Sequence, residues 1–178
     1  DAFVNNSKLA LVAIPTTSKR MITQICFSPC SRFVATSAME DFTVVRDLLT
    51  SRVVAMFPNP VKSWWPRALS FSSDSSLICT LFAQDGNSCA VYDLSAALEQ
   101  QQQRKRKQQR DDQDQGQLTT HPKFTLTTYR EQVFSARFSR RPGDFTLATT
   151  SNDGMVMLVD GLTGSTIHAI RAGDDWIR

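Results

Sequence analysis

The chain has 178 residues, of which 41% are hydrophobic and 21% are charged, and its formal net charge is +3 at pH 7. This apolar content is sufficient for the core of one domain, and no apolar run approaches the roughly 18 residues that a membrane-spanning helix needs. The mild positive charge does not by itself indicate nucleic-acid binding, because domains with that function usually gather a clear excess of Lys and Arg on one face.

Three segments of the chain repeat one pattern: a strand that ends in Phe-Ser, an alternating strand, and a third strand that ends in Asp. The interval from Phe27 to Phe71 is 44 residues, and a Gln-rich stretch lengthens the next interval, to Phe138. Without that stretch the period is about 40–45 residues, which is typical of a four-stranded propeller blade. The repeated segments span residues 22–47, 66–93 and 133–160.

Each repeat predicts four strands in the same order. Turns rich in Ser, Pro, Gly and Asp separate them, and Asp-Gly between apolar runs is a strong hairpin signal. Second strands are expected at residues 32–36, 77–81 and 145–149, and fourth strands at 52–57, 123–128 and 165–170. In the first strand, apolar residues lie five and two positions before the Phe, and we expect them to face the blade interior. They are Ile22 and Ile25, Pro66 and Leu69, and Val133 and Ala136.

The repeats therefore predict an all-β chain, a β-propeller segment built of four-stranded antiparallel blades, with three full units plus partial units at each end. We expect the outer strand of a preceding blade at residues 1–20, blades at 21–60, 61–130 and 131–172, and the start of a further blade at 173–178. The second blade contains a Gln-, Arg- and Lys-rich insertion at about residues 99–118. Because a propeller closes with about four to eight blades, we expect more chain or a partner to complete the ring.

The repeats resemble those of the WD-repeat β-propeller family. The resemblance rests on Phe-Ser-Pro at residues 27–29, on Ser-Asn-Asp-Gly at residues 151–154, and on the strand-ending Asp47, Asp93 and Asp160. The Gly-His pair that opens a typical unit is missing, so the family's buried Asp-His-Ser-Trp hydrogen-bond network cannot form as usual. We expect the blades to depend more on apolar packing. The Trp that precedes the Asp in the family is replaced by Arg46, Tyr92 and Val159.

Catalysis has little support in the sequence. The Gly-rich nucleotide-binding loops, the Gly-x-Ser-x-Gly nucleophile motif and the His-Glu-x-x-His zinc motif do not occur in it. Asp41, Asp85 and Asp153 lie at predicted turns, where a carboxylate usually accepts hydrogen bonds from local backbone amides. We predict that the chain is not an enzyme and that it binds no cofactor.

Cysteine and histidine form no metal-binding pattern. There is no Cys-x-x-Cys pair, and the two His, His121 and His168, are too few and too scattered for a metal cluster. We expect buried, reduced thiols, which are typical of an intracellular protein of the cytoplasm or nucleus; disulfides or a zinc site are the alternative. The four Cys are Cys26, Cys30, Cys79 and Cys89.

The insertion combines nine Gln with five bases and four acids over residues 99–117, so its charges nearly cancel. Such a segment has little to bury, and we expect it to project from the second blade as a disordered surface insertion. Its good helix formers also fit a short solvated helix before Asp111. In a further alternative, its basic residues form a nuclear-import or phosphate-contacting patch. They are Arg104, Lys105, Arg106, Lys107 and Arg110.

Two functions from different classes fit this sequence. The resemblance to WD-repeat proteins implies a non-enzymatic scaffold for protein–protein interactions in a multi-protein assembly. The alternative is a nucleic-acid-associated propeller, in RNA processing or chromatin, whose basic insertion contacts phosphates. The salt dependence of binding distinguishes the two functions, because phosphate binding weakens steeply as the salt concentration rises, whereas a mainly apolar protein interface does not. No membrane association is expected.

The candidate partner-binding surface follows from the position of the Trp residues. Trp65 and Arg67 flank the apolar position of the second repeat's first strand, and alternation turns them away from the blade interior, toward the loop end of that strand. Trp and Arg are enriched among interface hot spots. The alternative is that the Trp residues cap the ends of neighbouring blades. The full candidate set is Trp64, Trp65, Arg67, Trp176 and Arg178.

Overall fold

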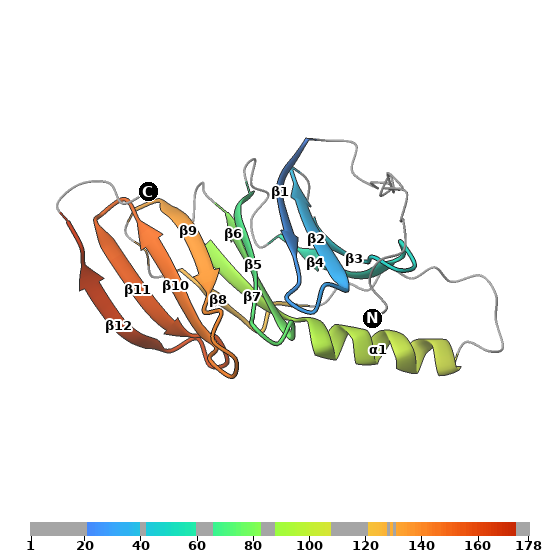
Figure 1. Ribbon diagram of the computed structural model, residues 1–178. Helices are drawn as coiled ribbons and strands as arrows, with labels where there is room; N and C mark the ends of the chain where they lie inside the picture. The colour runs from blue at the N-terminus through green and yellow to red at the C-terminus, as the bar shows by residue number, and fades with distance from the viewer. Residues whose placement is uncertain are drawn as a thin grey trace, which may run out of the picture.

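The computed structural model describes residues 21–39, 42–59, 66–82, 88–107, 121–127, 129 and 131–173. Within them, twelve strands form three four-stranded antiparallel sheets, and one helix is inserted in the second sheet (Figure 1). This architecture confirms the predicted all-β class and the four-stranded blades. The partial units expected at residues 1–20 and 173–178 lie outside the described residues, apart from Gly173.

The strands of each blade follow one another in the chain. The first blade contains β1 (Ile22–Phe27), β2 (Phe33–Ala38), β3 (Phe42–Asp47) and β4 (Val53–Pro58). The second contains β5 (Pro66–Phe71), β6 (Leu77–Phe82), β7 (Ser88–Asp93) and β8 (Phe124–Leu126), with helix α1 (Leu94–Lys107) between β7 and β8. The third contains β9 (Val133–Phe138), β10 (Thr146–Ser151), β11 (Met155–Asp160) and β12 (Thr166–Arg171). Sequential strands pair, so each blade is a meander.

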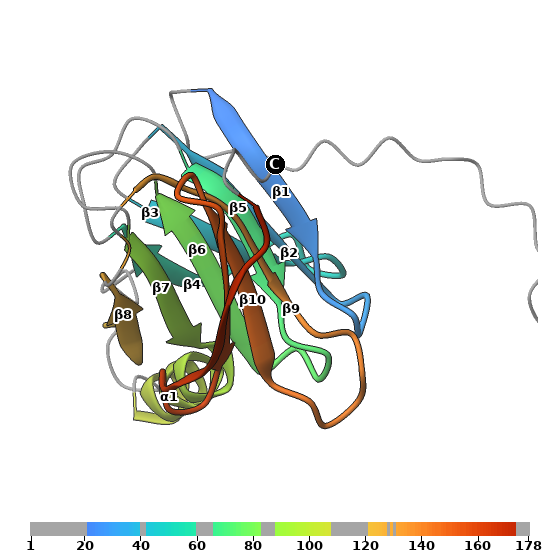
Figure 2. The ribbon, with the colours of Figure 1, turned by 90° about the vertical axis from the view of Figure 1, so that its left-hand side faces the viewer.

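The three blades stand side by side, and their first strands β1, β5 and β9 are neighbours (Figures 1 and 2). One hydrophobic cluster lies between the first and second blades and includes Phe57 and Tyr92. Another lies between the second and third blades and includes Leu81 and Leu147. The middle blade is therefore packed on both faces, which explains why every residue of β6 is buried and every residue of β12 is exposed.

One prediction about the first blade is wrong. Ile22 and Ile25 do not face a blade interior: their exposed fractions are 38% and 60%, and that of Phe27 is 61%. At the equivalent positions of the second blade, Leu69 and Phe71 are buried in the cluster against the first blade. The repeat pattern is the same, but no described blade packs against the face of β1 that carries Ile25 and Phe27.

The residues that replace the family's Trp are accommodated in three different ways. The Tyr92 ring stacks on Phe57, with their centroids 4.6 Å apart, and its hydroxyl donates a hydrogen bond to the carbonyl of Pro58. Burial raises the pKa of Tyr92, which keeps this hydroxyl protonated. Val159 is buried in the cluster between the second and third blades. Arg46 is also buried, and its Nη1 donates to the carbonyl of Ser51 at 3.3 Å.

The insertion has little to bury where it is described, as predicted, since Glu99, Gln100, Gln102 and Gln103 are exposed, but the helix that carries it begins before the insertion and is anchored there. Helix α1 begins at Leu94, and Leu94 and Ala97 are fully buried in the cluster between the first and second blades. Gln101 Nε2 donates to the carbonyl of Val53 at 3.4 Å, which connects the helix to β4. The Asp93 carboxylate caps the helix by accepting a hydrogen bond from the Ala96 amide at 2.8 Å. The short helix therefore packs on the blades, while residues 108–120 lie outside the described part of the chain.

We expect Leu94→Ala to lower the free energy of unfolding by about 2–5 kcal/mol, because it leaves a cavity between two blades and the helix. The matched control is Gln103→Ala on the exposed part of the same helix, which should change stability by less than about 0.5 kcal/mol. Urea denaturation followed by circular dichroism measures both. Equal stability of the two variants would show that the helix does not pack on the propeller in solution.

A second prediction concerns the exposed apolar side chains of β1. Exposed apolar patches promote association, so we expect the purified chain to self-associate. The double variant Ile25→Lys with Phe27→Lys should lower the mean mass measured by light scattering, because it places charge on this face. A monodisperse monomer for the unmodified chain would contradict this expectation.

Candidate functional site

Most of the candidate partner-binding residues lie outside the described residues. Arg67 is described and lies near the start of β5. The basic residues 104–107 form the last turn of α1. This helix follows β7, at the end of the second blade opposite to Arg67 (Figure 1). The structure therefore does not bring these basic residues together with Arg67. The residues outside the described part are Trp64, Trp65, Arg110, Trp176 and Arg178.

Arg67 is exposed, whereas its neighbours Pro66 and Ala68 are buried. The Arg67 Cζ atom lies 5.0 Å from the centroid of the Phe134 ring, on β9 of the third blade. This cation–π contact holds the guanidinium against the adjacent blade. A stacked guanidinium keeps its N–H groups at its edge, where they remain available to an external acceptor.

The first strands share a second feature, which sequence reasoning missed. Each of β1, β5 and β9 pairs with one strand only in the described part of the chain, so the backbone groups of the other edge need other partners. Side chains of adjacent blades provide them. Thr23 Oγ1 donates to the Pro66 carbonyl at 3.2 Å, and the Phe138 amide donates to Ser70 Oγ at 3.0 Å. We call these unpaired edges, with the side chains that bind them, the inner rim.

Arg137 belongs to this inner rim. It is exposed, and its Nη1 donates to the Leu69 carbonyl of β5 at 3.0 Å. Arg137, Ser70 and Cys26 occupy the same repeat position, directly before the Phe that ends the first strand. Aligning the three repeats on that Phe would have identified this position from the sequence.

The surroundings of Cys26 show how far the positive charge of the third blade extends. Burial raises the pKa of the Cys26 thiol, and this rise is opposed by a hydrogen bond from the Phe71 amide and by the charges of Arg137 and Arg140. Cys26 lies on β1, whereas Arg137 lies on β9 and Arg140 follows that strand. Their guanidinium groups are therefore within electrostatic reach of the first blade.

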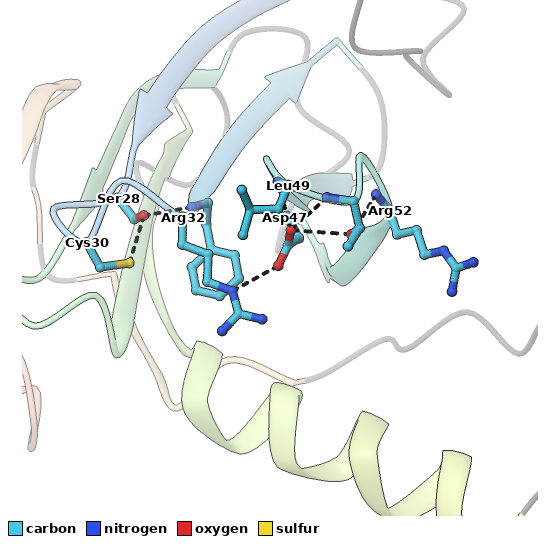
Figure 3. Close-up of polar contacts among 8 residues, drawn as sticks. Ser28, Cys30, Arg32, Asp47, Leu49 and Arg52 are labelled. Atoms are coloured by element: carbon cyan, nitrogen blue, oxygen red, sulfur yellow. Dashed lines mark hydrogen bonds and ion pairs between the residues drawn. The ribbon is translucent and has the colours of Figure 1, made fainter. Parts of the chain in front are cut away.

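Asp47 organises the turn that follows β3 (Figure 3). Its Oδ1 accepts hydrogen bonds from the Leu49 amide at 2.9 Å and the Thr50 amide at 3.0 Å, and its Oδ2 accepts one from Arg32 Nε at 2.9 Å. The hydrogen bond from Arg32 is the main cause that lowers the pKa of Asp47, and the two amides add to it. The carboxylate is therefore ionised at neutral pH and is committed to holding the turn.

Other turn acids act in the same way. Asp160 Oδ1 accepts hydrogen bonds from the Leu162 amide at 2.7 Å and the Thr163 amide at 3.3 Å, and Asp153 Oδ1 accepts one from the Met155 amide at 3.2 Å. With Asp93 at the start of α1, these contacts confirm that the strand-end and turn acids bind local backbone amides. Asp41 and Asp85 lie outside the described residues.

Within the described residues, no three His, Cys, Asp or Glu side chains could hold a metal ion, and no helix is long and apolar enough to cross a membrane.

The prediction of buried thiols is correct for two of the four cysteines. Cys79 and Cys89 are fully buried, and a hydrogen bond between their side chains, together with burial, raises the pKa of Cys79. Cys30 is exposed: burial alone would raise its pKa, but hydrogen bonds with Ser28 and Ser75 outweigh this effect and lower it. Cys26 is half-buried, and all four thiols are free.

Comparison with solved structures identifies the fold. Similar structures include U3-55K and the WD40 repeats of RRP9, each with a TM-score of 0.66 and 15% sequence identity. The alignments cover 90% of this chain but only 42% and 41% of those chains, respectively, so the chain spans less than half of their length. No protein-family model matches the chain, and no curated protein matches it in sequence. The chain has the fold of a WD-repeat propeller segment.

The Asp47 turn predicts a pH-dependent stability. We expect Asp47→Asn to destabilise the protein at neutral pH by about 0.5–2 kcal/mol, because Asn can still bind the turn amides but lacks the charge that the exposed Arg32 contacts. Since the native pKa of Asp47 is lowered, its contribution is complete above the unfolded-state pKa of about 3.9 and is lost as pH falls through the native pKa.

Urea denaturation of the wild type and the variant between about pH 2 and pH 7 measures this difference. The gap in unfolding free energy should shrink as the pH falls below about 4. Arg32→Gln should show the same trend, since it removes the other partner of the ion pair. A gap that is constant across the whole pH range would show that Asp47 acts only as a hydrogen-bond acceptor.

Proposed function

We propose that this chain is a non-enzymatic interaction scaffold that binds protein partners in a larger assembly. The observation that supports this proposal best is the inner rim, where exposed Arg67 and Arg137 are held against neighbouring strands while the turn acids are engaged in local hydrogen bonds. Rigid, exposed guanidinium groups suit recognition, because little side-chain freedom is lost on binding. WD-repeat propellers, whose fold the chain shares, are typically scaffolds without catalytic activity.

The proposed partner surface includes the loop end of β5. Arg67 is its described member, and Trp64 and Trp65 precede it directly in the chain. Trp176 and Arg178 repeat the same Trp-x-Arg spacing and are proposed to serve a second, equivalent position. Aromatic and guanidinium side chains commonly dominate the energy of protein interfaces.

The alternative function is a nucleic-acid-associated propeller that uses the basic insertion. The observation that favours it is the position of residues 104–107 at the end of α1, which leads away from the second blade (Figure 1). Arg104, Lys105, Arg106 and Lys107 are consecutive in the chain, and such a local concentration of positive charge suits contact with phosphates. The four free thiols fit an intracellular location, in the cytoplasm or nucleus, for either function.

We expect the double variant Trp65→Ala with Arg67→Ala to weaken partner binding by at least about tenfold, which corresponds to roughly 1.4 kcal/mol, because it removes two hot-spot side chains. The thermal midpoint should stay nearly unchanged. The measurement is quantitative mass spectrometry of the proteins that co-purify with the full-length wild type and the variant.

Two further results decide between the alternatives. If the double variant unfolds, the two side chains are structural caps; if it folds and retains its partners, the interface lies elsewhere. The nucleic-acid function would instead be favoured if the partners dissociate steeply as the salt concentration rises and if they are lost when residues 104–107 are replaced by Gln.

A further inference from the structure

We propose that Arg67 and Arg137 form a carboxylate-binding pair on the inner rim and that this pair recognises an acidic, extended segment of a partner protein. This inference rests on the proposed scaffold function and names the chemistry of its partner. Arg67 lies on β5 and Arg137 on β9, so the pair bridges the second and third blades.

Both guanidinium groups are positioned before any partner arrives. Arg67 stacks on the Phe134 ring at 5.0 Å, and Arg137 Nη1 donates to the Leu69 carbonyl at 3.0 Å. Each contact crosses from one blade to the other and fixes the direction of a long side chain. The remaining N–H donors of an Arg can bind a carboxylate in a bidentate manner, which gives the interaction both strength and direction.

The inner rim offers these cations no acid of its own. The three inner strands β1, β5 and β9 contain two bases, Arg67 and Arg137, and no Asp or Glu. Among the described residues, the ion pair that forms joins Arg32 to Asp47, in the first blade. Arg140 adds further positive charge beyond the end of β9, and it is exposed. The rim is therefore complementary to a negatively charged ligand.

The spacing of the pair fits an extended peptide. Arg67 packs on Phe134, and Arg137 follows Phe134 by three residues on the same strand, which corresponds to about 10 Å along β9. Acidic residues two to four positions apart in an extended segment are separated by about 7–13 Å. The contacts of Arg67 with Phe134 and of Arg137 with the Leu69 carbonyl both cross between β5 and β9, so one acidic segment that runs along these two strands passes both guanidinium groups.

Two observations favour a protein segment over a nucleic acid. Nucleic-acid binding through phosphates commonly uses about six to ten cationic contacts, more than the rim's arginines can make. Base stacking by single-stranded nucleic acids also needs an open aromatic face, and at the arginine pair Arg67 already lies over the ring of Phe134.

The test uses purified full-length protein and a fluorescein-labelled peptide of about ten alternating Glu and Ser residues, with binding followed by fluorescence anisotropy at low salt. We expect Arg67→Ala with Arg137→Ala to weaken binding by at least tenfold. Arg52→Ala is the matched control, because Arg52 is also exposed but lies on the turn of the first blade, away from the rim; it should change binding by less than twofold. Arg137→Lys, which keeps the charge but not the planar donor pair, should weaken binding by several-fold.

Three results would overturn the proposal. The first is no binding of the acidic peptide by the wild type, or equal binding of a control peptide with Gln in place of Glu. The second is an equal loss of binding in Arg52→Ala, which would mean that only overall charge matters. The third is tighter binding of a ten-nucleotide oligothymidine that is lost in the same double variant, which would assign the rim to nucleic acid. Thermal midpoints of all variants exclude unfolding as the cause.

The outcome also separates this inference from the scaffold function. If proteins co-purify through Arg67 but the acidic peptide does not bind, the scaffold function stands and the acidic specificity is wrong. If the peptide binds but no protein co-purifies, the rim is an anion site and the scaffold function loses its support.

Discussion

In the described part of the chain, each inner strand of this propeller segment pairs with another strand along one edge only, and side chains of adjacent blades bind backbone groups of the other edge. Ser70 accepts the Phe138 amide, and Arg137 binds the Leu69 carbonyl. The same contacts therefore satisfy the backbone and connect adjacent blades, because each side chain comes from the neighbouring blade. The constraint on the strand edge explains why polar residues are needed where the blades are otherwise held by apolar packing.

The same constraint connects structure with recognition. A side chain that binds a neighbouring strand edge is held by that contact, and a long charged side chain such as the exposed Arg137 has further N–H donors besides the one that it uses there. The turn acids have the opposite role, since Asp47 and Asp160 direct their carboxylates toward backbone amides. Positive groups are thus presented at the inner rim, while many negative groups are used inside the turns.

The departures from the family's repeat show how tolerant the blade is. Tyr92 replaces a Trp and retains both an aromatic stack and a hydrogen bond, Val159 retains only the apolar contact, and Arg46 retains one hydrogen bond. These residues differ in size and polarity, yet all three blades have four strands in the same order. The strand pattern and the interblade packing therefore stabilise the fold without one uniform polar network.

The sequence by itself determined the blades. Strand order and the amide-binding role of the turn acids are local properties, set by alternation and by turn chemistry, and they were predictable from single repeats, while comparison of the three copies gave the repeat period. Only the tertiary structure decided which apolar residues are buried: Ile25 and Leu69 occupy the same repeat position, but among the described blades only Leu69 has one against it. It also decided that Leu94 and Ala97 pack between blades and that Arg67 meets Phe134. The physical reason is that burial and cross-blade contacts depend on neighbours distant in the chain, which no local pattern records.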